Sequence, residues 1–370
     1  MAELIYSNSL TAANNIRYLT GFVAPDPALL ISFEKKHYLI VSSMEEGRAK
    51  KETKKEVKVL TPNALGLIGK QANNPNIIEK VILKLGIKQL QVTNFFPVGL
   101  FKEIEKKGIK ISLGRDEVYQ KRRKKKKVEI EYIKECQNAA VKAMKAIILL
   151  LKNSEIKYEN KLIYEKQQLT SERLREEAQK VLFKYGCIGT DIIVAGGDQA
   201  IDPHERGSGP LYAREAIIID IFPKNEKTGY WGDLTRTVCK GEPSKELKHL
   251  HKTVLSAQIT SLQNIKAGVC ADDIHKKIQI YFEKCGYRTN TSGIKNSGFI
   301  HGTGHGVGLD IHEAPRIGRS GDILRSGDIV TIEPGLYYPG LGGVRIEDTI
   351  CVTKSGFDML KPCSKKFIIN

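Results

Sequence analysis

The chain has 370 residues, of which 41% are hydrophobic and 27% are charged, a balance typical of globular proteins and sufficient for two domains of ordinary size. The longest apolar run near the middle, residues 146–151, is far shorter than the ~20 residues that cross a bilayer. The N-terminus also lacks the basic segment and apolar stretch of a secretory signal, so we expect neither a membrane span nor export.

Positive charge is concentrated at the N-terminal end. The formal net charge is +17, and residues 1–127 carry 25 Lys and Arg against 12 Asp and Glu, a net of +13. The run of seven cations from Lys121 to Lys127 could attract nucleic-acid phosphates. Because no aromatic residues accompany it for base stacking, we favour a solvated linker and helix start over a nucleic-acid site.

The cysteine pattern predicts free thiols. Seven is an odd number, and no two cysteines form a CxxC pair, so neither a zinc knuckle nor a disulfide framework is indicated. We therefore expect buried free thiols in a reducing cytoplasm. The cysteines are Cys136, Cys187, Cys239, Cys270, Cys285, Cys351 and Cys363.

The first ~120 residues alternate short apolar runs with helical segments, as α/β domains do. They contain no cluster of catalytic residue types. Strands are predicted over residues 28–33, 37–42, 57–60 and 89–93, and a helix over 75–85.

A long helix is predicted over residues 128–152, where apolar residues recur near helical spacing. Further helices are predicted over 171–185 and 244–265, and strands dominate from residue 216 onward. We place the boundary between Gly114 and Lys127 and divide the chain into domains of residues 1–122 and 123–370. The apolar residues of the long helix are Ile130, Ile133, Ala140, Met144, Ile147 and Leu151.

Two distant segments share one design. In the first, AIIIDIF, PKNEKTG and YWGDLTRTV read as strand, loop and strand, which places Asp220 and Asp233 on adjacent strands. In the second, IVTIEPG, LYYPGLGG and VRIEDTICV place Glu333 beside Glu347. One acid in a strand usually faces solvent. Four in matching hairpins, directed into apolar surroundings, need cations to compensate their charge.

Between the hairpins lies HGTGHGVGLDIHEAP, with His301, His305 and His312. Its glycines allow tight turns and close backbone approach, but the GxGxxG spacing of a dinucleotide loop is absent. We therefore favour an imidazole site and rank His305 and His312 above His301, which we expect only to fill structure. The remaining candidates, His37, His249, His251 and His275, are interpreted as surface or ordinary helix histidines.

Four carboxylates and one imidazole form an oxygen-rich ligand set that suits two divalent ions such as Mn²⁺, Co²⁺, Fe²⁺ or Zn²⁺. Two ions ~3.5 to 4 Å apart can activate a shared water and polarise a carbonyl. The sequence contains no GxSxG, HExxH or GxxxxGK[ST] motif. These residues therefore predict metal-dependent hydrolysis.

The same motifs resemble those of the pita-bread metallopeptidases, a family that includes prolidase, Xaa-Pro aminopeptidase and methionine aminopeptidase. The resemblance covers residues ~125 to 360, and NNIRYLTGF at residues 14–22 is similar to the opening of a creatinase-type N-terminal domain. It implies an α+β protein. A C-terminal pita-bread fold, a pseudo-twofold antiparallel sheet covered by helices, would follow a smaller α/β N-terminal domain.

The resemblance also implies residue roles. Asp233 and Glu347 would bridge the ions, and Glu333 would shuttle a proton for a hydroxide held between them. His204 in DPHERGSGP and His312 would contact the substrate. The implied metal ligands are Asp220, Asp233, His305, Glu333 and Glu347.

Residues near the implied ligands are candidates for supporting them. Arg345 lies two residues before Glu347, on the same strand face, where it would neutralise negative charge or orient a ligand. Thr331 lies two residues before Glu333 and Thr235 two residues after Asp233, and we expect them to support these carboxylates.

The segments GVRIED and EPGLYYPG resemble the proline-specific branch. That branch implies cleavage of the bond between an N-terminal residue and proline in proline-containing peptides, with Mn²⁺ as the expected metal, and a cytoplasmic homodimer. One departure is the loop after Asp220, about two residues longer than usual, where Phe222 and Pro223 intervene. Methionine aminopeptidase is the alternative enzyme, and a non-catalytic binding protein is the alternative class.

Overall fold

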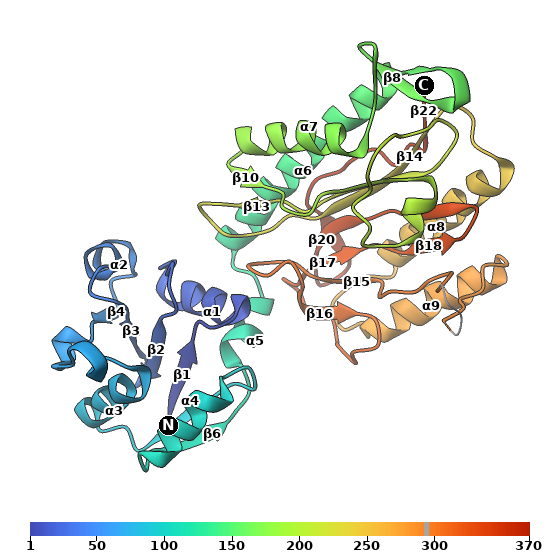
Figure 1. Ribbon diagram of the computed structural model, residues 1–370. Helices are drawn as coiled ribbons and strands as arrows, with labels where there is room; N and C mark the ends of the chain where they lie inside the picture. Colours follow the sequence, from blue (N-terminus) through green and yellow to red (C-terminus); the bar gives the residue numbers. More distant parts are fainter. Residues whose placement is uncertain (292–295) are drawn as a thin grey trace. The chain divides into compact units, whose positions relative to one another are not determined.

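The computed structural model describes residues 1–291 and 296–370. They form two compact units, Met1–Arg122 and Arg123–Asn370 (Figure 1). Each unit has its own buried apolar clusters, so each has the core that a separate domain needs.

The N-terminal unit is a mixed six-stranded sheet with helices packed on it, in the order β4-β3-β2-β1-β5-β6. The central strand β1 pairs antiparallel with β2 and parallel with β5. The strands are β1 Ala2–Tyr6, β2 Leu29–Phe33, β3 Lys36–Ile40, β4 Val57–Leu60, β5 Gln89–Val92 and β6 Lys110–Leu113. The helices are α1 Leu10–Thr20, α2 Glu46–Glu52, α3 Asn74–Leu85, α4 Val98–Lys106 and α5 Glu117–Arg123, which runs across the unit boundary.

The four predicted strands correspond to β2, β3, β4 and β5, and the predicted helix corresponds to α3. Helix α1 was not predicted, because its polar stretch hides the apolar face. Its signals are at its ends: Ser9 accepts a hydrogen bond from the Ala12 amide at 3.2 Å, and Gly21 adopts a φ of 82° as the C-cap. Both are typical helix boundaries.

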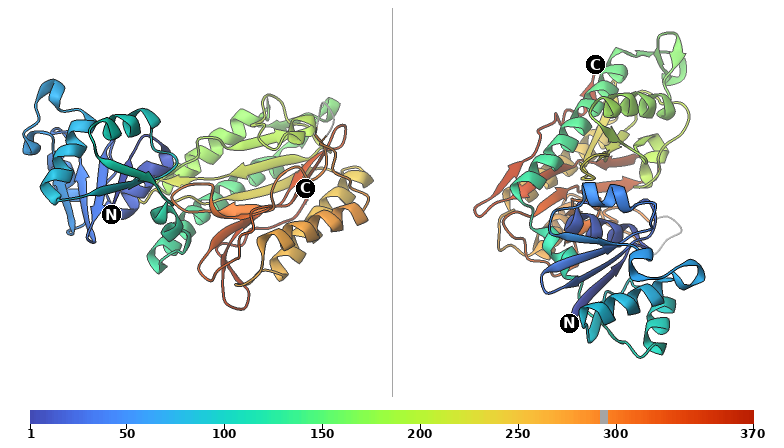
Figure 2. Two further views of the ribbon diagram at one scale, coloured as in Figure 1. Left: turned by 90° about the horizontal axis from the view of Figure 1, so that it is seen from below. Right: turned by 90° about the vertical axis from the view of Figure 1, so that its left-hand side faces the viewer.

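The C-terminal unit contains two principal sheets between helices. The first has the order β11-β12-β14-β22, and the second has the order β16-β15-β17-β20-β21. Helices α6 and α7 lie on one side of the strands and α8 and α9 on the other (Figure 2). The helices are α6 Lys127–Asn153, α7 Ser171–Lys184, α8 Lys245–Gln263 and α9 Ala271–Lys284.

Within the described residues, the two principal sheets are built from nine strands. Those of the first sheet are β11 Ile193–Gly196, β12 Ile217–Ile221, β14 Leu234–Lys240 and β22 Ile368–Ile369. Those of the second are β15 Gly304–Gly306, β16 Glu313–Ile317, β17 Ile329–Ile332, β20 Asp348–Val352 and β21 Phe357–Met359. A small three-stranded sheet is formed by β7 Glu155–Ile156, β8 Leu162–Tyr164 and β9 Gln167–Gln168. Two short pairs are formed by β10 Cys187–Ile188 with β13 Lys224–Asn225 and by β18 Gly335–Tyr338 with β19 Gly342–Arg345.

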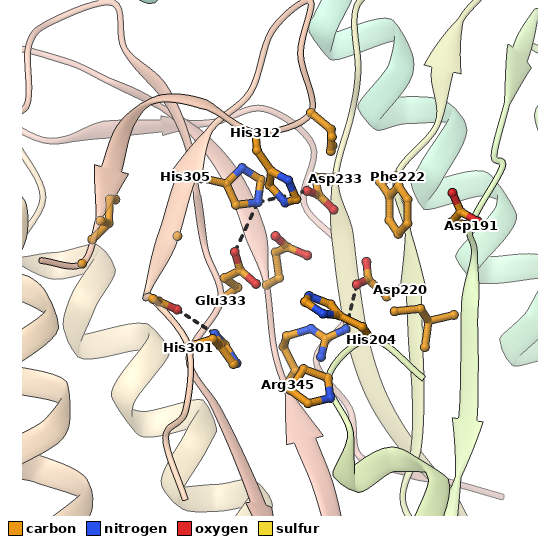
Figure 3. Close-up of a pocket in the computed structure, with 18 of the residues that line it drawn as sticks. Asp191, His204, Asp220, Phe222, Asp233, His301, His305, His312, Glu333 and Arg345 are labelled. Carbon is orange, nitrogen blue, oxygen red and sulfur yellow. Dashed lines mark hydrogen bonds and ion pairs between the residues drawn. The ribbon is translucent and has the colours of Figure 1, made fainter. Parts of the chain in front are cut away.

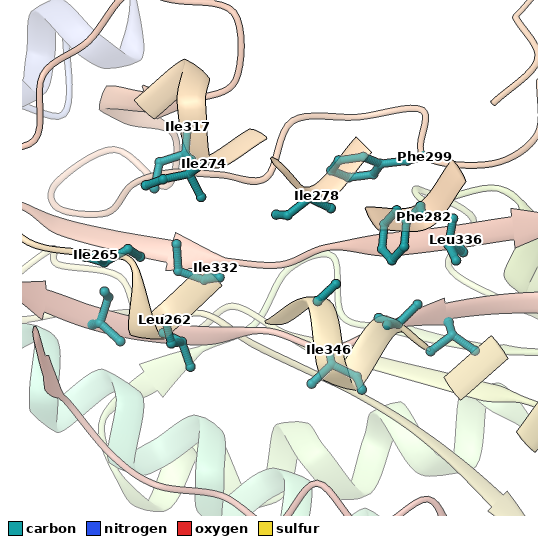
Figure 4. Close-up of a cluster of buried hydrophobic side chains, with 14 of the residues drawn as sticks. Leu262, Ile265, Ile274, Ile278, Phe282, Phe299, Ile317, Ile332, Leu336 and Ile346 are labelled. Atoms are coloured by element: carbon teal, nitrogen blue, oxygen red, sulfur yellow. The ribbon is translucent and has the colours of Figure 1, made fainter. Parts of the chain in front are cut away.

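Apolar side chains from α8 and α9 pack on the second sheet (Figure 4). On α9, Ile274, Ile278 and Phe282 recur at four-residue spacing and are all buried, so they form one stripe of the helix. This stripe meets Phe299 and Ile317 from the sheet side. The sequence interpretation recognised α6, α7 and α8 but not α9.

The cationic run is not wholly solvated, which corrects the predicted linker. It spans the end of α5 and the start of α6 as expected, but Arg122, Arg123 and Lys125 are buried. Carboxylates meet two of these charges, because Arg123 contacts Asp328 at 2.9 Å and Lys125 contacts Glu313. Buried cations are tolerated when they are paired in this way.

All seven cysteines are free thiols, as predicted, and Cys136, Cys187, Cys239 and Cys351 are buried. Within residues 1–291 and 296–370, we find no helix with the length and apolar content that a bilayer crossing requires.

His251 on α8 makes stability depend on pH. Its ring stacks on Phe367 at 4.2 Å, and within the described part of the chain its Nε2 atom has no hydrogen-bond partner. Burial lowers its pKa from the ordinary 6.5 to about 4. The folded state therefore favours the neutral ring, so this stabilisation is complete above pH ~6.5 and is lost as the pH falls towards 4.

We expect the free energy of unfolding of the wild type to fall by about 2 to 3 kcal/mol more than that of His251→Leu between pH 7 and pH 4.5. Urea unfolding at the two pH values measures the difference. His249→Leu, at an exposed position on the same helix, should retain the wild-type pH dependence. Equal losses in the wild type and His251→Leu would contradict this assignment.

Candidate metal centre

The first hairpin brings Asp220 and Asp233 together. Asp220 lies in β12, whose five residues are all buried, and Asp233 immediately precedes β14. The two strands are antiparallel, with Asp220 opposite Thr235. The predicted strand, loop and strand arrangement is therefore observed, and both carboxylates lie at one end of the pair.

The second hairpin places Glu333 and Glu347 in the same way. Strands β17 and β20 are antiparallel with Ile332 opposite Asp348, so Glu333 follows one strand and Glu347 precedes the other. The segment between them is more than the predicted loop, because it forms the β18–β19 hairpin. It returns the chain through Arg345 to Glu347.

The two hairpins meet through short polar contacts. The Thr235 hydroxyl donates to Glu347 Oε2 at 2.7 Å, and the Glu347 amide donates to the Thr235 carbonyl at 3.1 Å. Thr235 thus supports Glu347 and not Asp233, contrary to the predicted pairing. Thr331 does contact Glu333 as predicted, at 3.2 Å. It also accepts a hydrogen bond from the His305 amide at 3.0 Å.

His305 faces these acids, with Glu333 and Asp233 beside its ring (Figure 3). Its Nε2 atom is 3.3 Å from Glu333 Oε1 and 3.6 Å from Asp233 Oδ2. Ligand atoms of Asp233, His305 and Glu347 all lie within 4.8 Å of one another. Four of the five predicted ligands are therefore gathered around one point.

Asp220, the fifth predicted ligand, is held by Arg345. The guanidinium donates to Asp220 Oδ2 at 2.7 Å and to the Tyr337 hydroxyl at 2.9 Å. Arg345 therefore neutralises negative charge at the site, one of the two roles expected for it. Nearby carboxylates and the Tyr337 hydroxyl raise its pKa against the opposing effect of burial.

The donor set fits divalent cations. Among the described residues, Asp220 Oδ1 and Glu347 Oε1 are buried without a hydrogen-bond partner. Burial, with repulsion between neighbouring carboxylates, raises the pKa of Asp233 and Glu347 well above the usual range. Burial lowers the pKa of His305 to about 3, so its imidazole is neutral, as a metal ligand must be. Cations would satisfy the unpaired oxygens and relieve the repulsion.

The site opens into a cavity of about 630 Å³. His204 and His312, predicted to contact the substrate, are exposed on its wall. The His312 ring meets the His305 ring edge-on at 4.3 Å. Phe222, from the unusually long loop, also lines the cavity beside Asp220.

Three residues of the site, His301, Tyr337 and Gln137, were undervalued or missed in the sequence. His301 lines the cavity and its Nε2 atom lies 2.9 Å from the Tyr337 hydroxyl, so it does more than fill structure. Its place in one motif with His305 was the available signal. Gln137 on α6 accepts from the Asp233 amide and donates to the Asp233 carbonyl, both at 2.8 Å. Its signal was a polar residue within the apolar stripe of the predicted helix.

Comparisons with known proteins agree with this geometry. The model of metallopeptidase family M24 matches residues 131–354, and that of the creatinase/prolidase N-terminal domain matches residues 5–112. A Xaa-Pro dipeptidase from Pyrococcus horikoshii is 32% identical over 293 residues, which cover 76% of each chain.

Solved structures extend the similarity to the whole chain. An X-Pro aminopeptidase from Thermotoga maritima has a TM-score of 0.81 at 28% identity and covers 100% of this chain and 97% of its own. A Xaa-Pro dipeptidase from Bacillus anthracis has a TM-score of 0.83 at 26% identity, with coverages of 100% and 95%. The predicted α+β pita-bread fold with a creatinase-type N-terminal domain is confirmed. The chain belongs to metallopeptidase family M24.

Proposed function

We propose that this protein hydrolyses the peptide bond between an N-terminal residue and proline, with Asp220, Asp233, His305, Glu333 and Glu347 as its metal ligands. The observation that carries the proposal is the convergence of these side chains on one cavity, with two buried carboxylate oxygens unpaired. The similarity to proteins named Xaa-Pro dipeptidase and X-Pro aminopeptidase supports the choice of substrate.

The proposed ligands would hold two divalent ions, for which we favour Mn²⁺ over Co²⁺, Fe²⁺ and Zn²⁺. Bound there, the ions would supply Lewis acidity and lower the pKa of a water molecule. Metal choice follows availability as well as ligand type, so a carboxylate-rich set suits Mn²⁺ without requiring it.

Glu333 is the proposed acid and base. Burial raises the pKa of its carboxyl group to about 7, near the pH at which a group can both accept and release a proton. The Thr331 hydroxyl donates to Glu333 Oε1 at 3.2 Å and fixes the orientation of the carboxylate. Glu333 can thus take a proton from the attacking water and give one to the departing proline nitrogen.

The remaining residues bind and orient the substrate. His204 and His312 lie on the cavity wall, where their ring nitrogens can form hydrogen bonds with the peptide. His312 is exposed to the cavity but partly desolvated by its wall, which lowers its pKa, so we propose that it acts as a neutral imidazole. Arg345 holds Asp220 at 2.7 Å and fixes that carboxylate beside the cavity.

We further propose a cytoplasmic homodimer in which residues 1–122 and 123–370 act as separate domains. Free buried thiols suit a reducing compartment, and the division into compact units supports the domain boundary. The resemblance to enzymes with creatinase-type N-terminal domains supports the dimer.

Purified protein supplied with Mn²⁺ is expected to release the first residue from an Xaa-Pro dipeptide or tripeptide and to leave Met-Ala-Ser intact. The ratio of kcat/KM for dipeptide and tripeptide then defines the preferred length. Metal analysis should find about two ions per chain, and a chelator should abolish activity until Mn²⁺ is restored. Cleavage of Met-Ala-Ser alone would indicate a methionine aminopeptidase. A protein that binds no metal and cleaves none of the peptides would indicate a binding function.

A further inference from the structure

Lys125 is a cation buried within the C-terminal unit. Its side chain is 1% exposed, and its Nζ atom contacts Oε1 of Glu313, whose side chain is 3% exposed. Lys124, Lys126 and Lys127 beside it are exposed. Lys125 therefore differs from its neighbours in the same run, because its charge is buried in contact with the Glu313 carboxylate.

Glu313 in turn organises the segment that follows His305. Its Oε2 atom accepts from the Asp310 amide at 3.4 Å. A Cβ atom added to Gly308 would lie only 2.4 Å from the same carboxylate, so the backbone must approach it closely. The carboxylate thus fills the turn formed by residues 306–313. We call this turn the histidine loop because it follows His305 and contains His312.

The first hairpin also contacts the histidine loop, through Trp231. The Trp231 indole donates to the Leu309 carbonyl at 3.1 Å, and the Trp231 amide donates to the Gly308 carbonyl at 3.0 Å. Trp231 thus contacts the loop directly, and Lys125 contacts it through Glu313. The loop contains His312, whose ring meets that of His305 edge-on.

We propose that Lys125 is a positioning residue of this site: by holding the Glu313 carboxylate, it sets the histidine loop so that His305 and His312 face the cavity. Stability alone is a weak reason for such a pair, because buried ion pairs can often be replaced by uncharged side chains without loss. The Lys125–Glu313 pair differs in this respect, because its carboxylate accepts a backbone hydrogen bond inside the turn and a cation is needed to hold it there. The activity measurement below rests on the proposed substrate, whereas the metal measurement rests only on the proposed metal ligands.

The test uses the full chain with Lys125→Met, Glu313→Gln and the double variant, with Lys124→Met as the matched control at an exposed position. Thermal unfolding measures the fold, calorimetric titration of the metal-free protein with Mn²⁺ measures affinity, and kcat and KM are measured with an Xaa-Pro dipeptide. Lys125→Met leaves the Glu313 charge buried alone and should be the least stable of the four.

The double variant is the decisive protein. It should recover most of the stability, because no charge is left unpaired, yet bind Mn²⁺ about 10- to 100-fold more weakly than the wild type and show a reduced kcat. Lys124→Met should match the wild type in all three measurements. Recovery of Mn²⁺ affinity together with stability would overturn the proposal, because the pair would then be structural only. A double variant that does not fold would overturn it as well, because the pair would be holding the fold and not the loop.

The two proposals fail separately. If the wild type cleaves no Xaa-Pro peptide while the double variant still loses Mn²⁺ affinity, the proposed function is wrong and the positioning role stands. If the wild type cleaves Xaa-Pro peptides and the folded double variant binds Mn²⁺ and turns over as the wild type does, the positioning role is wrong and the function stands.

Discussion

Replacing Glu333 with glutamine is expected to lower kcat for Xaa-Pro peptides by about 10²- to 10⁴-fold, the usual contribution of a positioned acid and base. Glutamine keeps the size of the side chain and one oxygen donor, but it cannot accept and release a proton. Burial raises the pKa of the Glu333 carboxyl group to about 7, and we propose Glu333 as the ligand that transfers the proton. Steady-state kinetics at saturating Mn²⁺ measure the effect.

Two controls separate chemistry from folding in this experiment. Thermal unfolding of Glu333→Gln should show a folded protein, because the change removes a buried acid that repels its neighbours. Glu226→Gln, the same change at an exposed position, should leave kcat unaltered. A fully active Glu333→Gln variant would remove Glu333 from the mechanism and would contradict the assignment of the whole site.

Replacing Gln137 with leucine should weaken both the fold and the metal site. Gln137 is buried and makes two hydrogen bonds of 2.8 Å with the Asp233 backbone. Leucine would remove the partner of the Asp233 amide and one of two donors to the Asp233 carbonyl, which the Thr349 hydroxyl also reaches at 2.7 Å. The expected cost is about 1 to 3 kcal/mol in the free energy of unfolding. The loss of orientation at Asp233 should weaken Mn²⁺ binding by about 10- to 100-fold.

Urea unfolding and calorimetric titration with Mn²⁺ measure the two effects of Gln137→Leu. The matched control is Glu135→Leu, which introduces the same side chain at an exposed position of α6 and should change neither quantity strongly. Wild-type Mn²⁺ affinity in a destabilised Gln137→Leu variant would show that Asp233 does not depend on this contact.

The sequence predicted an element best where a regular spacing of apolar residues within that element determines its type. The predicted helix over 128–152 corresponds to α6 because its apolar residues form a single stripe. Strand β1 was missed because its evidence is not local. Its partners β2 and β5 lie far along the chain, and only the assembled sheet identifies five N-terminal residues as its centre.

The candidate site was likewise predictable where its signals are local, but not where they depend on contacts between distant segments. Asp220, Asp233, Glu333 and Glu347 were found because each hairpin has a local pattern that repeats. The contact between hairpins was not predictable in detail, and so Thr235 was assigned to Asp233 although its hydroxyl donates to Glu347. Tyr337 was overlooked for a related reason. Its hydroxyl forms hydrogen bonds with Arg345 and His301, and only three-dimensional packing brings these residues together.

The hydrogen bond from Thr235 to Glu347 spans 112 residues of chain, which sets an order of events during synthesis. At ~5 to 20 residues per second, the ribosome takes about 6 to 22 seconds to make the second hairpin after the first. During that interval, Asp220 and Asp233 have no His305, Glu333 or Glu347 beside them, and an ion captured by them would be only partly enclosed. Metal acquisition should therefore follow translation of Glu347, and newly made protein should depend on the supply of free ions at that moment.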